Sequence, residues 1–288
     1  MQTVTILGLG RAGGALAIAL DRAGVSIDQL VYRTQPAELP GIEIRQTGLD
    51  ELRSIDADIV VISTQDPEIR SAAARLAELE RLPRVALHLS GSLSSAELEP
   101  LKAKGVATAS MHPLASISDS TIGADRFAGA YFCVEGDTEA VDAATELVRA
   151  LGGSPFTIDT AFKPLYHASA VTASGNITAL FDEAIEMLSK CGVERQAAHA
   201  ILFPLLQSSV ANLAGQSTED ALTGPFVRGD IDAFRRHLSS FEGVISSDLR
   251  EVYLLLAERS VAITRRSSPA RSDQLAEAIS MAKRKTEC

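Results

Sequence analysis

A glycine-rich stretch close to the amino terminus restricts the fold more than any other feature of the sequence. ILGLGRAGGAL places Gly8, Gly10 and Gly13 in G-x-G-x-x-G spacing, after an apolar run of strand type and before an Ala/Leu-rich run of helix type. In that setting the first glycine makes a tight turn, the second lets a phosphate approach the backbone, and the third lets the helix pack closely on the strand. The motif therefore predicts a βαβ unit that binds a dinucleotide. A glycine-rich turn without a ligand is the alternative.

The rest of the first half continues this alternation of strand and helix patterns, which is typical of a mostly parallel sheet covered by helices on both faces. Strands are expected near residues 3–8, 28–33, 57–63, 84–90, 105–111, 129–135 and 154–158, and helices near 11–23, 67–79, 94–103 and 138–151. After about residue 160 the strand patterns stop, and turn clusters divide the remaining helical patterns into roughly five helices. We therefore predict a Rossmann-type, doubly wound α/β domain over residues 1–159 and an all-α domain over residues 160–288.

Composition argues against several classes of partner. The chain of 288 residues is long enough for two domains, and its 46% hydrophobic and 22% charged residues are typical of a soluble globular protein. No apolar run approaches the length of a membrane span, and a strand pattern begins where a signal peptide would lie, so we expect a cytoplasmic protein. A formal charge of -10 argues against binding to nucleic acid or anionic membranes. Cys133, Cys191 and Cys288 lack metal-ligand spacing, and no metal site is predicted.

The end of the second expected strand indicates which dinucleotide binds. NAD sites usually carry an Asp or Glu here to bind the ribose 2′-hydroxyl, whereas LVYRTQ places Arg33 and Thr34 at this point. A guanidinium and a hydroxyl suit a 2′-phosphate, so the sequence predicts NADP, bound as NADPH. A surface arginine unrelated to any ligand is the alternative. The residues expected to contact the cofactor are Gly8, Leu9, Gly10, Arg11, Ala12, Gly13, Arg33, Thr34, Thr64, Gln65 and Ser90.

Polar residues gather at the ends of the later strands, where an open α/β sheet binds its ligand. The turn STQDP supplies Thr64 and Gln65 as a wall of the cofactor site. Ser90 in LHLSGS and His112 in SMHPL could reach either the nicotinamide ring or a substrate. His88 alternates with Ser90 along its strand, so it either takes part in the site or is a buried histidine with satisfied hydrogen bonds.

The stretch FKPLYHASAVTASGN, residues 162–176, carries polar side chains on an otherwise Ala-rich helical pattern. If a helix starts near its first residue, Lys163, His167 and Ser174 fall within about 40° of one another and share a face. A positioned Lys or His can stabilise and protonate a carbonyl or imine that accepts a hydride, so Lys163 and His167 are the predicted catalytic residues. The alternative is a structural helix whose lysine snorkels and whose histidine bonds a carbonyl. Asn176 points away from Lys163 unless Gly175 bends the helix.

The second half carries one further polar constellation, ALTGPFVRGD. Gly224 and Pro225 make a turn, Asp230 can cap the following helix, and Arg228 is left to bind a substrate carboxylate or phosphate. A structural loop with an ion pair between Arg228 and Asp232 is the alternative.

Taken in order, several motifs resemble one family. They are the glycine-rich turn, STQDPEI, HLSGSLSSAEL, ASMHPLAS, KPLYHASAVTAS and ALTGPFVRGD. Their order is similar to that of Rossmann-like proteins with a helical carboxyl domain, long catalogued as a domain of unknown function. These are similar in plan to ketopantoate reductase, pyrroline-5-carboxylate reductase and the β-hydroxyacid dehydrogenases.

This resemblance implies nucleotide binding at Gly8, Gly10 and Gly13, with Lys163 and His167 at the mouth of the site. It also implies dimerisation through the helical half. Ketopantoate reductases place an Asn four residues after the catalytic Lys, and this sequence has His167 there.

Together these patterns predict an NADPH-dependent reductase of a small oxo acid, similar to ketopantoate, or of a cyclic imine, with hydride transfer in a cleft between the domains. The predicted substrate-binding residues are Ser90, His112, Ser174, Asn176 and Arg228. One alternative is an NADP-binding sensor or structural dimer without redox catalysis. The other is an enzyme that binds the nucleotide for a purpose other than redox chemistry.

Overall fold

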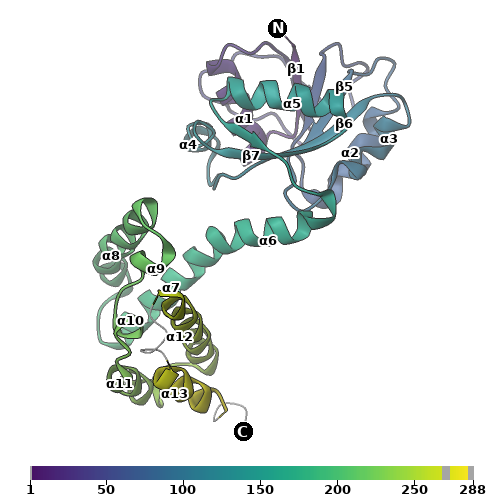
Figure 1. Cartoon of the computed structure of the whole chain (residues 1–288). Helices are drawn as coiled ribbons and strands as arrows, with labels where there is room; N and C mark the ends of the chain where they lie inside the picture. The colour runs from purple at the N-terminus through teal and green to yellow at the C-terminus, as the bar shows by residue number, and fades with distance from the viewer. Residues whose placement is uncertain (1, 268–272, 285–288) are drawn as a thin grey trace. The chain divides into compact units, whose positions relative to one another are not determined.

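The computed structural model describes residues 2–267 and 273–284 (Figure 1). The chain divides into two compact units, Met1–Ser174 and Gly175–Cys288. Each unit is described by itself below.

The first unit is built on one eight-stranded sheet with the order β3-β2-β1-β4-β5-β6-β7-β8. The strands are β1 (Val4–Leu7), β2 (Ile27–Tyr32), β3 (Gln46–Gly48), β4 (Ile59–Ile62), β5 (Val85–His88), β6 (Ala107–Pro113), β7 (Tyr131–Gly136) and β8 (Ser154–Phe156). Neighbouring strands are parallel except β6 and β7, which pair antiparallel. The sheet is therefore mostly parallel, as the sequence predicts.

Helices cover both faces of this sheet. They are α1 (Arg11–Arg22), α2 (Ile69–Leu76), α3 (Glu99–Lys102), α4 (Ser120–Ala124) and α5 (Thr138–Ala150), with short 3₁₀ turns η1 (Asp66–Glu68), η2 (Ser95–Leu98) and η3 (Thr160–Phe162). Ile6 and Leu87 pack with α1 and α5 on one face, and Leu7 and Ala86 pack with α2 and α3 on the other. Successive strand residues point to opposite faces, so β1, β4 and β5 are buried on both sides. The doubly wound α/β fold is confirmed.

One strand of the sheet is not evident from the sequence. β3 consists of Gln46, Thr47 and Gly48 and pairs only with β2. Its three residues carry no alternating or continuous apolar pattern. The strand forms because the edge of β2 offers it hydrogen-bond partners. That pairing depends on the tertiary structure and not on the local sequence.

Helix α6 (Lys163–Ala173) ends the first unit, and the backbone leaves helical geometry at Ser174, where φ is -128° and ψ is -78°. Ser174 Oγ donates to the carbonyl oxygen of Ala170 at 2.8 Å, a back-bond that competes with the helical hydrogen bonds and often bends a helix. The next helix starts at Gly175.

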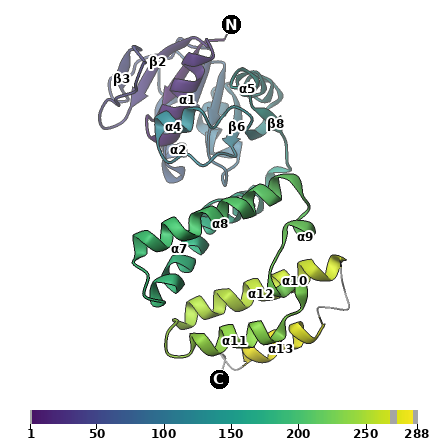
Figure 2. The same cartoon turned by 90° about the vertical axis from the view of Figure 1, so that its left-hand side faces the viewer.

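The second unit contains helices only in its described part (Figure 2). They are α7 (Gly175–Lys190), α8 (Arg195–Gly215), α9 (Thr218–Ala221), α10 (Pro225–Arg228), α11 (Ile231–Phe241), α12 (Ser247–Ser267) and α13 (Asp273–Arg284). The two four-residue helices α9 and α10 fall in clusters that the sequence predicts as turns, because Ser217 caps α9 and Pro225 starts α10. The helical second half is confirmed.

The core of this unit lies among α11, α12 and α13. Its buried residues are Phe234, Leu254, Ala257, Val261, Leu275, Ile279 and Ala282. Helices α7 and α8 lie side by side (Figure 2) and contribute few buried residues, chiefly Ile185 and Ala198. By length and composition alone, α8 could cross a membrane, with a mean hydropathy of 1.2 and 6% of its apolar window buried; no other described helix passes this test.

Candidate functional site

The carboxyl ends of four adjacent parallel strands bring several of the predicted site residues to one edge of the sheet. β1, β4, β5 and β6 are neighbours in that order and run parallel. The glycine-rich turn follows β1, Thr64 and Gln65 follow β4, Ser90 follows β5, and His112 lies near the end of β6. This edge is where open α/β sheets bind ligands.

The glycine-rich turn has the geometry of a phosphate cradle. Gly8 has a φ of +96°, and a Cβ there would lie 2.7 Å from the carbonyl oxygen of Ser63. A Cβ at Gly13 would lie 1.9 Å from the carbonyl oxygen of Gly8, whereas a Cβ at Gly10 would meet nothing within 4 Å. The turn therefore needs glycine at the first and third positions for its own packing, and it leaves open space at the second.

Helix α1 starts directly behind this open space. Gly10 is its N-cap and has no side chain with which to cap the first N–H groups. The first intrahelical bond runs from the Gly14 N–H to the Gly10 carbonyl at 2.8 Å. The N–H groups of Arg11, Ala12 and Gly13 are therefore left for an anion, and the positive end of the helix dipole faces the same place.

A cavity of about 650 Å³ adjoins the turn. Its lining comes from Gly8, Leu9, Gly10, Tyr32, Arg33, Thr34, Gln35, Pro36, Ala37, Glu38, Ser63, Thr64, Gln65 and Glu68. Seven of the predicted cofactor residues are among them, while Ser90 is not. Thr64 Oγ1 is buried and has no hydrogen-bond partner within residues 2–267 and 273–284. A nucleotide hydroxyl or phosphate would satisfy this atom, so the cavity suits a dinucleotide.

Arg33 does not stand free in this cavity. Its guanidinium forms an ion pair with the carboxylate of Glu68, which lies in η1 after β4. The hydrogen bond and the charge of Glu68 raise the pKa of Arg33, so the side chain is a permanent cation.

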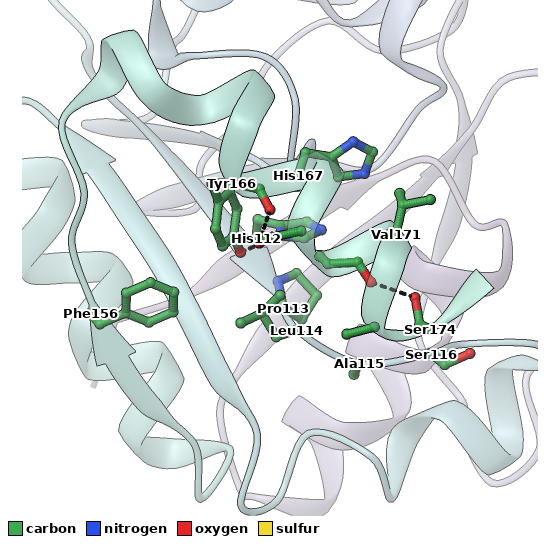
Figure 3. Close-up of a pocket in the computed structure, with 13 residues that line it drawn as sticks. His112, Pro113, Leu114, Ala115, Ser116, Phe156, Tyr166, His167, Val171 and Ser174 are labelled. Atoms are coloured by element: carbon green, nitrogen blue, oxygen red, sulfur yellow. Dashed lines mark hydrogen bonds between the residues drawn. The ribbon is translucent and has the colours of Figure 1, made fainter. Parts of the chain in front are cut away.

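A second cavity, of about 630 Å³, lies within the first unit (Figure 3). It is lined by His112, Pro113, Leu114, Ala115, Ser116, Phe156, Tyr166, His167, Ser169, Ala170, Val171, Ala173 and Ser174. His112, His167 and Ser174 are thus brought together, as predicted residues of one site.

Three polar rings line this second cavity, those of His112, Tyr166 and His167. His112 Nδ1 and the Tyr166 hydroxyl lie 2.7 Å apart and share a hydrogen bond, and the rings of His112 and His167 meet edge to face at 5.8 Å between centroids (Figure 3). A Cβ at Gly91 would lie 2.6 Å from both His112 Nε2 and His167 Cδ2. The glycine therefore lets both imidazoles approach the loop after β5.

Burial keeps His112 and Tyr166 uncharged. Desolvation, with a smaller contribution from His167, lowers the pKa of His112 to about 4. Desolvation also raises the pKa of Tyr166 above its ordinary value. Near neutral pH the pair is a neutral imidazole and a neutral phenol, which can orient a substrate oxygen or nitrogen by hydrogen bonds.

Lys163 is fully buried in a polar cluster with Ser90, Ser110 and Glu135. Its Nζ donates to Ser110 Oγ at 2.5 Å and to the Ser90 carbonyl oxygen at 3.4 Å, and it lies 3.2 Å from Glu135 Oε1. Glu135 also accepts from the backbone N–H and the hydroxyl of Ser95, both at 2.9 Å. Burial lowers the pKa of Lys163, and Glu135 opposes that shift.

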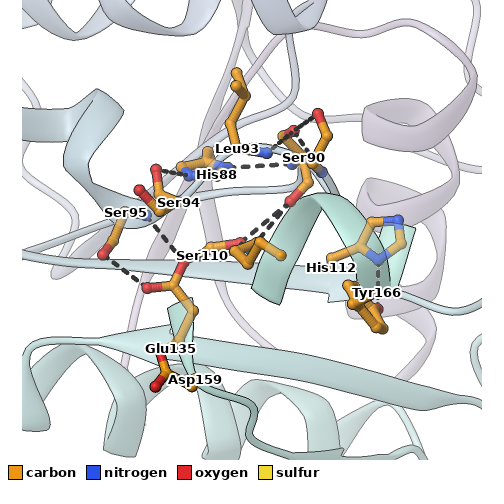
Figure 4. A network of polar contacts seen from close by, with 12 residues as sticks. His88, Ser90, Leu93, Ser94, Ser95, Ser110, His112, Glu135, Asp159 and Tyr166 are labelled. Atoms are coloured by element: carbon orange, nitrogen blue, oxygen red, sulfur yellow. Dashed lines mark hydrogen bonds and ion pairs between the residues drawn. The ribbon is translucent and has the colours of Figure 1, made fainter. Parts of the chain in front are cut away.

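His88 and Ser90 belong to a hydrogen-bond network that is satisfied internally (Figure 4). The Ser90 N–H donates to His88 Nδ1 at 3.1 Å, so the ring proton is on Nε2, which donates to the Ser94 carbonyl at 3.0 Å. Burial lowers the pKa of His88 to about 4, and the ring is neutral. The hydroxyls of Ser90 and Ser92 donate to Asp66 Oδ2 at 2.8 and 2.7 Å. Of the two interpretations of His88, the satisfied buried histidine fits this geometry.

The two remaining predicted residues belong to the second unit. Asn176 lies in the first turn of α7, and Arg228 is exposed at the end of α10. The alternative ion pair between Arg228 and Asp232 is not formed, since Asp232 lies 3.6 Å from Arg235 instead.

Sequence reasoning assigns no role to Tyr166, Glu68 or Glu135. Tyr166 stands beside His167 in the chain, but only the fold places it against His112. No three His, Cys, Asp or Glu side chains of the described residues are grouped so as to hold a metal ion.

Comparison with known proteins agrees with this architecture. Residues 130–260 match the family described as a domain of unknown function, DUF2520. A "putative NADP oxidoreductase" from Bacteroides fragilis is 21% identical, with a TM-score of 0.73 over 90% of this chain and 97% of that one. A protein from Thermotoga maritima is 20% identical, with a TM-score of 0.71 over 91% and 98%.

More distantly, pyrroline carboxylate reductase from Plasmodium falciparum, solved with NADP bound, is 14% identical, with a TM-score of 0.59 over 94% and 98%. No curated protein matches the sequence. The chain therefore shares its fold with these proteins over at least nine-tenths of its length, and residues 130–260 match the domain-of-unknown-function family that its motifs resemble.

Proposed function

We propose that the protein is an NADPH-dependent reductase of a small carbonyl or imine compound. The observation that carries the proposal is the pair of cavities associated with one edge of the sheet. One adjoins a phosphate cradle and contains a cation and an unpartnered hydroxyl, and the other contains neutral hydrogen-bonding groups. The likeness to a pyrroline carboxylate reductase solved with NADP supports it as well.

In this proposal the first cavity holds the nucleotide. The pyrophosphate lies against Gly10 and the first N–H groups of α1, and the 2′-phosphate is bound by Arg33 and Thr34. Thr64 and Gln65 form the facing wall. The bound NADPH supplies a hydride, which adds to the C=O or C=N carbon while a proton adds to the oxygen or nitrogen, leaving NADP⁺.

The second cavity takes the substrate. His167 lines it and is the proposed acid, and the neutral pair of His112 and Tyr166 orients the polar end of the double bond. Lys163 is enclosed by Ser110 and Glu135, so it is not proposed to contact the substrate. Its proposed contribution is the positive charge of an ammonium group that donates to the Ser90 carbonyl oxygen. This charge opposes positive charge on a nearby imidazole, and it contributes to the lowered pKa of His112.

Small oxo acids and cyclic imines remain the proposed substrates. Arg228, exposed on α10, keeps its proposed role as carboxylate anchor, and Ser174 and Asn176 keep theirs as substrate contacts. An Arg228→Gln variant tests this role: KM should rise for acids and stay unchanged for neutral imines.

The test of the function is consumption of NADPH across a panel of oxo acids and cyclic imines. The His167→Ala variant should lose at least about 100-fold in kcat while binding NADPH as the unaltered protein does. NADPH binding without turnover of any compound in the panel would favour the alternative of a nucleotide sensor.

We also propose that the second unit forms a homodimer through α7 and α8. These helices expose the large apolar residues Ile177, Leu180, Ile201, Phe203, Leu205, Val210 and Leu213. Monomers rarely leave large apolar patches in water. The proposed partner is a second copy of the chain and not a lipid bilayer. Helix α8 packs along α7 within a folded unit, and it would have to leave that unit in order to span a membrane.

Light scattering after size exclusion tests the dimer. The Leu205→Glu variant should be monomeric, and a Val244→Glu control, which places the same charge on an exposed apolar site outside these helices, should remain dimeric. A monomeric unaltered protein, or one that partitions into vesicles, would contradict the dimer.

A further inference from the structure

Arg33 and Glu68 form an ion pair at the cofactor cavity, and the strand order of the sheet brings them together. Arg33 directly follows β2, and Glu68 ends η1 after β4. β2 and β4 flank β1 on its two sides, and β1 leads into the glycine-rich turn. The pair therefore reaches across the carboxyl end of β1, and both side chains line the cavity.

Glu68 stands where it competes for the cation that a 2′-phosphate needs. Its side chain is 31% exposed and that of Arg33 is 51% exposed, so both can be reached from the cavity. Within the described part of the chain, each is the other's sole ion-pair partner. An NAD site usually has its acid at the end of the second strand, and here a carboxylate reaches that end from a different element.

Resting on the proposed function, we propose that Glu68 determines cofactor selectivity by competing with the 2′-phosphate of NADPH for Arg33. A phosphate that binds the guanidinium through two hydrogen bonds must displace the carboxylate or lie beside it, where like charges repel. NADH carries a hydroxyl at this position and displaces nothing. Glu68 thus weakens NADPH binding and leaves NADH binding unchanged. The two dissociation constants therefore differ less than they would without this carboxylate.

The expected effect is modest because exposed ion pairs are weak. In the Glu68→Gln variant NADPH should bind about three- to fivefold more tightly, and the dissociation constant of NADH should stay the same. Glutamine keeps the size of the side chain, so the ratio of the two constants reports the charge alone.

The control is Glu38→Gln. Glu38 lines the same cavity and is exposed, and no ion pair links it to Arg33 in the described structure. This variant removes one negative charge from the cavity without freeing the guanidinium, and the ratio of dissociation constants should change by less than about twofold.

The experiment is a fluorescence titration of the full chain with NADPH and with NADH at one ionic strength. It uses the unaltered protein, Glu68→Gln, Glu38→Gln, Arg33→Gln and the Arg33→Gln/Glu68→Gln double variant. If the carboxylate acts through Arg33, the gain in NADPH affinity seen in Glu68→Gln disappears in the Arg33→Gln background.

Three results would overturn the inference. NADPH binding to Glu68→Gln that is unchanged or weaker would mean that the carboxylate orients Arg33 instead of competing for it. An equal gain in the Glu38→Gln control would reduce the effect to general charge. If the unaltered protein bound neither nucleotide, the inference and the proposed function would fail together. If it bound NADPH through Arg33 but Glu68→Gln brought no gain in NADPH affinity, only the role of Glu68 would fail.

Discussion

His112 and Tyr166 share a hydrogen bond of 2.7 Å that joins strand β6 to helix α6. The same helix carries His167, whose ring meets His112 edge to face. One strand end and one helix turn therefore hold all three polar rings of the second cavity, and His112 contacts both of the others.

Removing the phenol oxygen tests this arrangement. In Tyr166→Phe the ring keeps its contact with Phe156, at 5.9 Å between centroids, but His112 loses its hydrogen-bond partner. The free energy of unfolding should fall by about 1 kcal/mol. For the proposed reductase, kcat should fall while the dissociation constant of NADPH is unchanged. Urea unfolding and steady-state kinetics provide both readouts, and unchanged kcat would exclude the phenol from the chemistry.

The buried pair of Lys163 and Glu135 should behave as one structural element. Lys163→Met leaves a buried carboxylate without its cation and should cost about 3–5 kcal/mol of unfolding free energy. Adding Glu135→Gln removes that uncompensated charge and should recover a large part of the loss. Urea unfolding of both single variants and the double variant gives the coupling; additive losses would show that the two side chains do not depend on each other.

Stability should fall as the solution is acidified, through His88. Its folded pKa of about 4 lies below the unfolded value of about 6.5, so the unfolded chain binds the extra proton first. Its contribution is fully present above pH 6.5, shrinks as the pH falls through the window from 6.5 to 4, and levels off below it. The free energy of unfolding falls by up to about 3 kcal/mol over this window. The slope should be shallower in His88→Gln, measured by urea unfolding from pH 7.5 to 4.5, and equal slopes would contradict the assignment.

Two glycines of the glycine-rich turn should have different roles, Gly10 in nucleotide binding and Gly13 in folding. Gly10→Ala meets no atom within 4 Å, so the protein should fold normally while the new methyl group blocks phosphate approach and weakens NADPH binding at least about tenfold. Gly13→Ala would press a methyl group on the Gly8 carbonyl and should instead destabilise the fold by about 1–3 kcal/mol. Thermal unfolding and nucleotide titration of both variants check this; the reverse pattern would be inconsistent with a phosphate cradle.

Features that depend on local periodicity could be predicted from the sequence. Continuous apolar runs such as 59–62 predict buried parallel strands, and the glycine spacing predicts the turn between β1 and α1. Helical periodicity likewise places Lys163 and His167 on one face of α6. It gives the direction of a side chain but not its depth, and Lys163 is enclosed by Ser110 and Glu135 whereas His167 lines a cavity.

Features that depend on which elements become neighbours could not be predicted in this way. Arg33 and Glu68 are 35 positions apart, and they meet because β2 and β4 lie on either side of β1. Tyr166 meets His112 for the same kind of reason. The break at Ser174 depends on a side-chain bond to the Ala170 carbonyl, a choice that residue patterns leave open.

The most direct test of the central claim is a side-by-side titration of the purified protein with NADPH and NADH at one ionic strength. The cradle at Gly10 and the cation at Arg33 predict saturable binding of both, tighter for NADPH, with the NADPH preference lost in Arg33→Asp. Binding of neither nucleotide would mean that the glycine-rich turn serves only the packing of α1 on β1, and the proposed reductase would lose its basis.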